Sequence, residues 1–126
     1  MTPPGIAEAL RELVFAPVQS VDAVMDKFFA PGYVHRTSGR KQTREEFAEH
    51  ARLARNEIIR GSATVLDELQ TGSAYAERHL LDVTRRDGGR QNSEIYIIGT
   101  YAPDGRFASL NETGFPLLHD SEEGTS

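Results

Sequence analysis

Residues 74–101, AYAERHLLDVTRRDGGRQNSEIYIIGTY, decide the fold. Two runs with the alternating pattern of β-strands flank residues 87–89 (DGG), which favour a tight turn. Further turn residues stand on either side of this stretch, at 71–73 (TGS) and 103–105 (PDG). The sequence therefore predicts four consecutive strands, at about residues 63–69, 74–84, 94–101 and 107–115. Short turns between consecutive strands indicate antiparallel hairpins.

Upstream of this predicted sheet the apolar spacing is helical. Three helices are expected: residues 5–15, a second from the N-cap Ser20 to a break at Pro31-Gly32, and a third from the capping box of Thr43 and Glu46 to a stop at Gly61. A short extended piece, residues 33–36, separates the last two helices. Helices followed by hairpins predict an α+β fold, with three N-terminal helices packed on one face of a curved antiparallel sheet.

The composition fits one globular domain over residues 1–126. The 126 residues are 38% hydrophobic and 26% charged, and they include no cysteine, which excludes thiolate chemistry and fits a cytoplasmic location. A net charge of -5 argues against a nucleic-acid partner, and no apolar run is long enough to span a membrane. Residues 36–44 are expected to form a basic solvated loop, and residues 120–126 a disordered tail.

Several strings resemble one family. Residues 28–37 (FFAPGYVHRT) and the capped helix that follows resemble the opening of SnoaL-like polyketide cyclases. These belong to the nuclear-transport-factor-two-like superfamily, with ketosteroid isomerases and limonene epoxide hydrolases. Residues 74–78 and 95–112 resemble its later strands, so the resemblance covers a core of about residues 6–118. It implies a cone-shaped α+β barrel (cystatin-like) around a ligand cavity, and a homodimer formed through the outer face of the sheet.

The resemblance also implies polar groups at two places in the cavity. His35 and Arg36 match the extended piece, where the cyclases commonly have a histidine in the position of Arg36. Glu112 matches the final strand, near the position of an acid/base aspartate in these cyclases, and the same match places Arg78 inside. The predicted catalytic set is Glu112 as general base, His35 as proton shuttle, and Arg78 as a tuner of Glu112 or a substrate-anion clamp. A structural ion pair between Arg78 and Glu112 is the alternative.

Six further residues are candidates for substrate contact: Arg36, His50, Asp82, Tyr96, Tyr101 and Leu110. Alternation in the strand at 74–84 places Arg78 and Asp82 on one face and Glu77 and His79 on the other. Both faces mix polar and apolar groups, and the resemblance favours the face with Arg78 as the inward one. His79 and His119 are given the least weight among the histidines. The histidine spacing fits no metal site, and neither a metal nor a cofactor is expected.

Two classes of function stay open. One is a cofactor-independent cyclase or isomerase that removes a proton beside a carbonyl of a small hydrophobic molecule. The steroid-isomerase mechanism is not expected, because Ile97 stands where ketosteroid isomerases have an aspartate. The other class is a non-catalytic domain of the same fold that binds a ligand or only dimerises. A weaker third option, an epoxide hydrolase, requires Asp82, Arg78 and Glu112 to point inward together.

Overall fold

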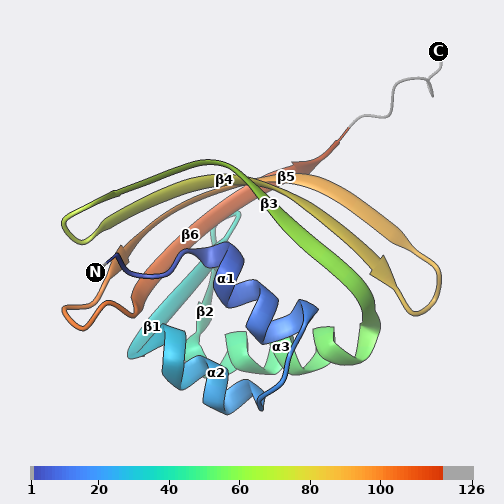
Figure 1. Cartoon of the computed structure of the whole chain (residues 1–126), viewed down its shortest axis with the longest axis horizontal. Coiled ribbons are helices and arrows are strands. Elements are labelled where there is room, and N and C mark those ends of the chain that lie inside the picture. The colour runs from blue at the N-terminus through green and yellow to red at the C-terminus, as the bar shows by residue number, and fades with distance from the viewer. Residues whose placement is uncertain (1, 118–126) are drawn as a thin grey trace.

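The computed structural model describes residues 2–117, so the predictions for the tail at 120–126 and for His119 lie outside the described residues. The elements, in chain order, are α1 (Ile6–Leu10), a π-helical turn η1 (Arg11–Phe15), α2 (Val21–Phe28), β1 (Phe29–Thr37), β2 (Arg40–Thr43), α3 (Arg44–Glu57), β3 (Ile58–Thr71), β4 (Ala74–Arg85), β5 (Arg90–Tyr101) and β6 (Phe107–Pro116). The long strands bend into an arch over the helices (Figure 1). The predicted α+β fold class is confirmed.

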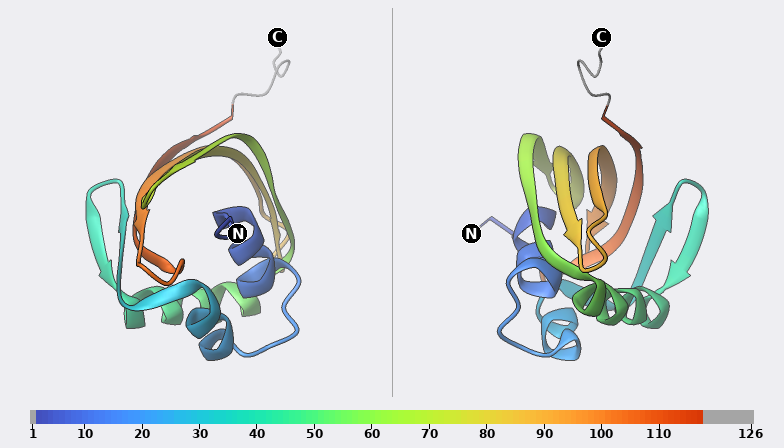
Figure 2. Two further views of the ribbon diagram at one scale, coloured as in Figure 1. Left: turned by 60° about the vertical axis from the view of Figure 1, so that its left-hand side comes forward. Right: turned by 90° about the vertical axis from the view of Figure 1, so that its right-hand side faces the viewer.

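The six strands form one sheet in the order β2-β1-β6-β5-β4-β3. The pairs β3–β4, β4–β5 and β5–β6 are antiparallel, as the hairpin turns predict. β1, in contrast, runs parallel to β6, a pairing that no turn in the sequence signals. The arch surrounds α1, while α2 and α3 lie across its open side (Figure 2). The concave face of the sheet therefore meets the helices, and the convex face points away from them.

The buried core contains a cluster of packed aromatic rings. Phe29 packs edge-on against Tyr33, with ring centroids 4.6 Å apart, and Phe107 stacks on Tyr101 at 5.0 Å. The apolar stripe of α2 is buried against them: Val21, Val24, Met25 and Phe28. Burial of large apolar side chains is the main favourable term in folding, so this cluster fixes the helices on the sheet.

Three predicted boundaries differ from the structure. The second helix ends at Phe28, and Pro31-Gly32 lie in an irregular part of β1, where the register shifts between Phe29 and Val34. The third helix ends at Glu57, before Gly61, which is part of β3. A Cβ at Gly61 would collide with the Phe15 ring, so this glycine allows η1 to approach the sheet closely.

The basic segment at residues 36–44 is a hairpin and not a loop. β1 and β2 pair antiparallel across a two-residue turn, with Ser38 at φ 50 and Gly39 at φ 85. Two positive φ angles in succession characterise the type I′ turns that join twisted strands. The capping box of α3 is present as predicted, with the Thr43 and Glu46 side chains accepting from each other's backbone N–H groups. None of the helices within residues 2–117 is long and apolar enough to cross a lipid bilayer.

Candidate functional site

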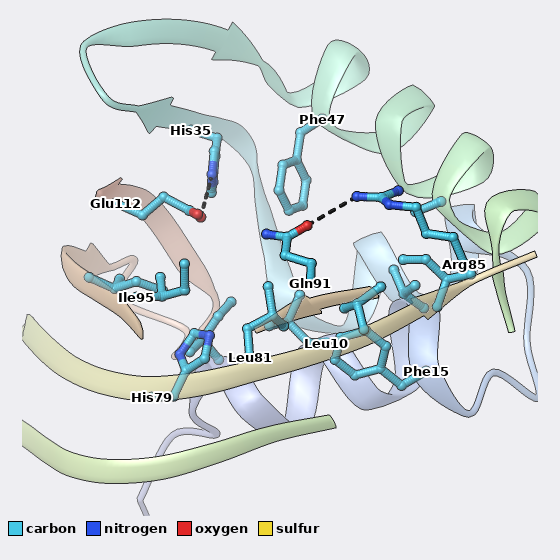
Figure 3. Close-up of a pocket in the computed structure, with 16 residues that line it drawn as sticks. Leu10, Phe15, His35, Phe47, His79, Leu81, Arg85, Gln91, Ile95 and Glu112 are labelled. Atoms are coloured by element: carbon cyan, nitrogen blue, oxygen red, sulfur yellow. Dashed lines mark hydrogen bonds and ion pairs between the residues drawn. The ribbon is translucent and has the colours of Figure 1, made fainter. Parts of the chain in front are cut away.

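A cavity of about 280 Å³ lies between the concave face of the sheet and the helices (Figure 3). Its wall is mostly apolar, with contributions from α1, α3, β4 and β5. The apolar residues include Ile6, Leu10, Phe47, Leu81, Ile95 and Ile97. Five polar side chains also reach the wall: His35, His79, Arg85, Gln91 and Glu112. A few polar groups in an apolar hollow are typical of a small-molecule site.

Tyr33, His35 and Glu112 lie in one row of polar contacts: Tyr33 is hydrogen-bonded to His35, and His35 contacts Glu112 where both line the cavity. The Tyr33 hydroxyl lies 2.6 Å from Nδ1 of His35, and Nε2 of His35 lies 2.9 Å from Oε1 of Glu112. The parallel pairing of β1 with β6 brings them together, because it places Thr37 opposite Glu112 and His35 opposite Leu110. A carboxylate only accepts, so Nε2 carries the proton, and in the neutral ring Nδ1 accepts from the Tyr33 hydroxyl.

The surroundings of Tyr33 keep its phenol neutral. Burial, followed by the charge of Glu112, raises the pKa of Tyr33 above its usual range, so the hydroxyl remains a donor at neutral pH. The His35 ring also packs on Phe47, with centroids 4.6 Å apart. The His35 side chain is 6% exposed and that of Glu112 is 25% exposed. Glu112 also lines a second, more polar hollow with Thr37 and Ser38, so its carboxylate stands between the apolar cavity and the outside.

Glu77 and His79 form a second polar pair, on β4. Nδ1 of His79 lies 2.8 Å and 3.0 Å from the two carboxylate oxygens of Glu77, and both side chains are almost fully buried. The resemblance favours the face of β4 with Arg78 as the inward one, and this prediction is wrong: the inward face carries Glu77 and His79, together with Tyr75, Leu81 and Val83. Alternation groups these residues on one face, but both faces of β4 mix polar and apolar side chains, so the sequence does not show which face is buried.

Arg78 consequently points outward, and its predicted partnership with Glu112 is wrong. Its guanidinium lies 2.7 Å from Asp67 and 3.1 Å from Glu94, both on the convex face. Hydrogen bonds to Asp67 and then to Glu94 raise the pKa of Arg78. Successive side chains in a strand point to opposite faces, so an inward Glu77 and His79 leave no inward place for Arg78.

Four of the six predicted substrate-contact residues also face away from the cavity. Arg36 and Tyr96 are exposed on the outward sides of β1 and β5, and Asp82 pairs with Arg90 at 3.2 Å on the outer face of β4. His50 is exposed on α3. With Arg78 and Asp82 outside, the residue set expected for an epoxide hydrolase does not assemble.

The other two predicted contacts point inward but stop short of the cavity. Leu110 is fully buried in the core. The Tyr101 hydroxyl is held by Gln70 at 3.0 Å and by the Pro4 carbonyl at 2.8 Å, near the start of α1. Within residues 2–117, the histidines and carboxylates form no group of three or more that could hold a metal ion.

This fold is shared with several solved structures of low sequence identity. A candidate SnoaL-like polyketide cyclase from Jannaschia sp. CCS1 is 14% identical, with a TM-score of 0.69 over 86% of this chain and 81% of that one. IdmH, a candidate polyketide cyclase from Streptomyces antibioticus, is 18% identical, with a TM-score of 0.66 over 87% and 86% of the two chains. An NTF2-like protein of unknown function from Burkholderia pseudomallei K96243 is 13% identical, with a TM-score of 0.59 over 83% and 86%. The expected resemblance in fold to SnoaL-like and nuclear-transport-factor-two-like proteins is confirmed.

Sequence comparison adds one relative. No model of a known protein family matches the chain. An uncharacterised protein of Schizosaccharomyces pombe is 29% identical over 91 residues, which cover 71% of this chain and 68% of that protein. These similarities establish the fold alone, because one fold can carry many functions.

Proposed function

We propose that the protein catalyses cofactor-free acid/base chemistry on a small carbonyl-containing molecule, in the manner of a cyclase or isomerase. The observation that carries this proposal is the row of polar contacts from Tyr33 through His35 to Glu112, of which His35 and Glu112 line an apolar cavity. Glu112 is the general base, and His35 orients it through Nε2–H. Arg78, which points to the outer face, has no part in the proposed reaction.

The reaction begins with the Glu112 carboxylate taking a proton from the carbon beside the carbonyl. The electron pair of that C–H bond forms the enolate, and the carboxylic acid of Glu112 then returns the proton at a second position. The contact with Nε2 of His35 aims the carboxylate and shares its charge, while Tyr33 fixes the tautomer of the ring. A well-placed base of this kind contributes about 10²- to 10⁴-fold in rate.

The proposal is tested by proton exchange on a model ketone. 2-Tetralone incubated with the protein in D₂O should exchange its α-protons faster than in buffer, as followed by NMR. Glu112→Gln keeps the shape and can still accept from His35 but is no base, so exchange should fall by about 10²-fold or more with little change in melting temperature. His50→Gln, an exposed histidine on α3, is the matched control and should exchange as the wild type does.

The rival function is a non-catalytic ligand-binding domain, in which the same pair only fixes β1 on β6. An exchange rate equal in the wild type and in Glu112→Gln, with a lowered melting temperature in the variant, would support this rival and overturn the catalytic proposal.

We also propose a homodimer formed through the convex face of the sheet. Leu69 and Ile98 lie in one cross-strand row of that face and are 71% and 68% exposed. Two rows away, Phe115 stacks on Tyr96 with centroids 6.1 Å apart. Exposed apolar side chains gathered on a sheet face favour association with another surface. A cytoplasmic location remains a prediction, which cell fractionation tests.

A further inference from the structure

We propose that His79, held by Glu77, binds the oxygen of a ligand with one or two rings inside the same cavity. This inference rests on the cavity of the proposed function but on different residues. His79 would act on the ligand oxygen, and Glu112 on the carbon beside it.

The first support is an unsatisfied nitrogen. The Glu77 carboxylate accepts from Nδ1 of His79, so in the neutral ring Nε2 is left with a free lone pair. The ring lines the cavity and is 1% exposed, and Nε2 has no hydrogen-bond partner among the residues that the structure describes. Buried polar groups are normally hydrogen-bonded. A partner for Nε2 is therefore expected inside the cavity.

The second support is the position of this nitrogen relative to Glu112. His79 pairs with Ile95 on β5, while Ile97 pairs with both Glu77 on β4 and Glu112 on β6. β4 and β6 are two strand spacings apart, or about 10 Å. Figure 3 shows His79 and Glu112 on one side of the cavity, with Ile95 between them. A ligand over Ile95 therefore meets the imidazole at one end and the carboxylate at the other.

The size of the cavity restricts the ligand. An apolar protein cavity of about 150 Å³ accommodates benzene. A volume of about 280 Å³ is somewhat less than twice that, which fits one ring or two fused rings. The mostly apolar wall selects an uncharged ring system. The ligand class is thus a neutral mono- or bicyclic ketone, or its enol.

The two groups together complete the proton transfer. When Glu112 takes the proton from the α-carbon, the C–H electron pair forms a carbon–carbon double bond. The carbonyl oxygen, which can only accept, takes a proton from Nε2–H of the protonated His79 ring; this leaves a neutral enol, whose hydroxyl then donates to the Nε2 lone pair of the neutral imidazole. Glu77 stabilises the imidazolium and holds the ring, as carboxylates do for catalytic histidines. The reverse transfers, at a second carbon, restore both groups.

The test compares two probes that differ by one hydroxyl. 2-Naphthol is a stable two-ring enol, and naphthalene has the same ring system without oxygen. The measured quantity is the ratio of the naphthalene Kd to the 2-naphthol Kd, from fluorescence titration. In the double variant Glu77→Leu, His79→Leu this ratio should be about tenfold smaller than in the wild type, because the enol loses its partner. His50→Gln should keep the wild-type ratio.

Single variants separate the positioning role of Glu77 from that of His79. Glu77→Gln retains an oxygen that accepts from Nδ1–H, so the selectivity ratio should be retained. Glu77→Leu frees the ring, and the ratio should fall even though His79 is intact. Should the leucine variants fail to fold, ¹⁵N NMR of the wild type provides a second measurement. The Nε2 resonance of His79 should shift with 2-naphthol and not with naphthalene.

Three results would overturn this inference. The first is a ratio of the two Kd values that is unchanged in the double variant. The second is a His79 Nε2 resonance that does not shift with 2-naphthol, and the third is a wild type that binds neither probe. If Glu112→Gln abolished the selectivity while the double variant kept it, the hydroxyl would bind Glu112, and the role of His79 would be wrong. None of these results would contradict the proposed function, because proton exchange on 2-tetralone tests that function separately.

Discussion

At the scale of single residues, the tyrosine hydroxyls, three of them in buried rings, make the first prediction. Burial raises the pKa of Tyr33, Tyr75 and Tyr101, and a hydrogen bond to Glu94 raises that of Tyr96. These are the four tyrosines of the chain, which has no tryptophan to mask their absorbance. Phenolate absorbance at 295 nm should appear well above pH 10 in the native protein, and near pH 10 in urea.

These raised tyrosine pKa values also make the stability of the folded protein depend on pH. The folded-state pKa values lie above the unfolded ones, so above pH 10 the native protein binds more protons than the unfolded chain. The stability from neutral buried phenols is therefore complete below about pH 10 and is lost as the pH rises further. The urea midpoint should fall between pH 9.5 and pH 11. Coincident native and urea titration curves would contradict the burial of these rings.

The candidate site shows which residue-scale features the sequence can predict. His35 and Glu112 were identified from the resemblance of two strings, and the structure places them 2.9 Å apart. The prediction that Arg78 points inward is wrong, and His79, which the sequence gives little weight, lines the cavity; both differences have one reason. A shift of one residue in a strand exchanges its faces, and the polar residues of β4 are divided between both. The choice depends on which face the helices cover, and that is a property of the packed molecule.

At the scale of elements, the capping box of α3 makes a prediction about stability. Thr43 accepts from the Glu46 backbone at 3.1 Å, and α3 carries Phe47 onto the His35 ring. Thr43→Ala should lower the free energy of unfolding by about 1 kcal/mol, as other lost N-caps do. Thr43→Ser keeps the hydroxyl and is the control. Urea denaturation measures both, and equal losses in the two variants would contradict a capping role.

The elements themselves follow largely from local signals. Turn residues and alternation predict the strands from β3 to β6, and the caps at Ser20 and Thr43 predict the starts of α2 and α3. The parallel contact of β1 with β6 could not be predicted in this way, because strands far apart in sequence are joined by no turn. The end of α3 at Glu57 was missed for a related reason. β3 begins directly at Ile58, and its pairing with β4 overrides the glycine stop.

At the scale of the whole molecule, the convex face of the sheet predicts the oligomeric state. Light scattering after size exclusion should give twice the monomer mass for the wild type. Ile98→Asp should give the monomer mass, because it places a charge in the apolar contact. Val18→Asp is the matched control, since Val18 is 92% exposed on the loop before α2. A monomeric wild type would contradict the proposed dimer.

The middle position of β6 in the sheet has a consequence for how the protein is made. β6 is the last of the six strands to leave the ribosome, yet it lies between β1 and β5. Chains emerge N-terminus first, so the facing edges of β1 and β5 stay unpaired in the nascent protein until β6 inserts between them. The same insertion joins His35 to Glu112. We therefore expect sheet closure and assembly of the candidate site to be one late event, so that a stalled nascent chain is open to aggregation and lacks the contact between His35 and Glu112.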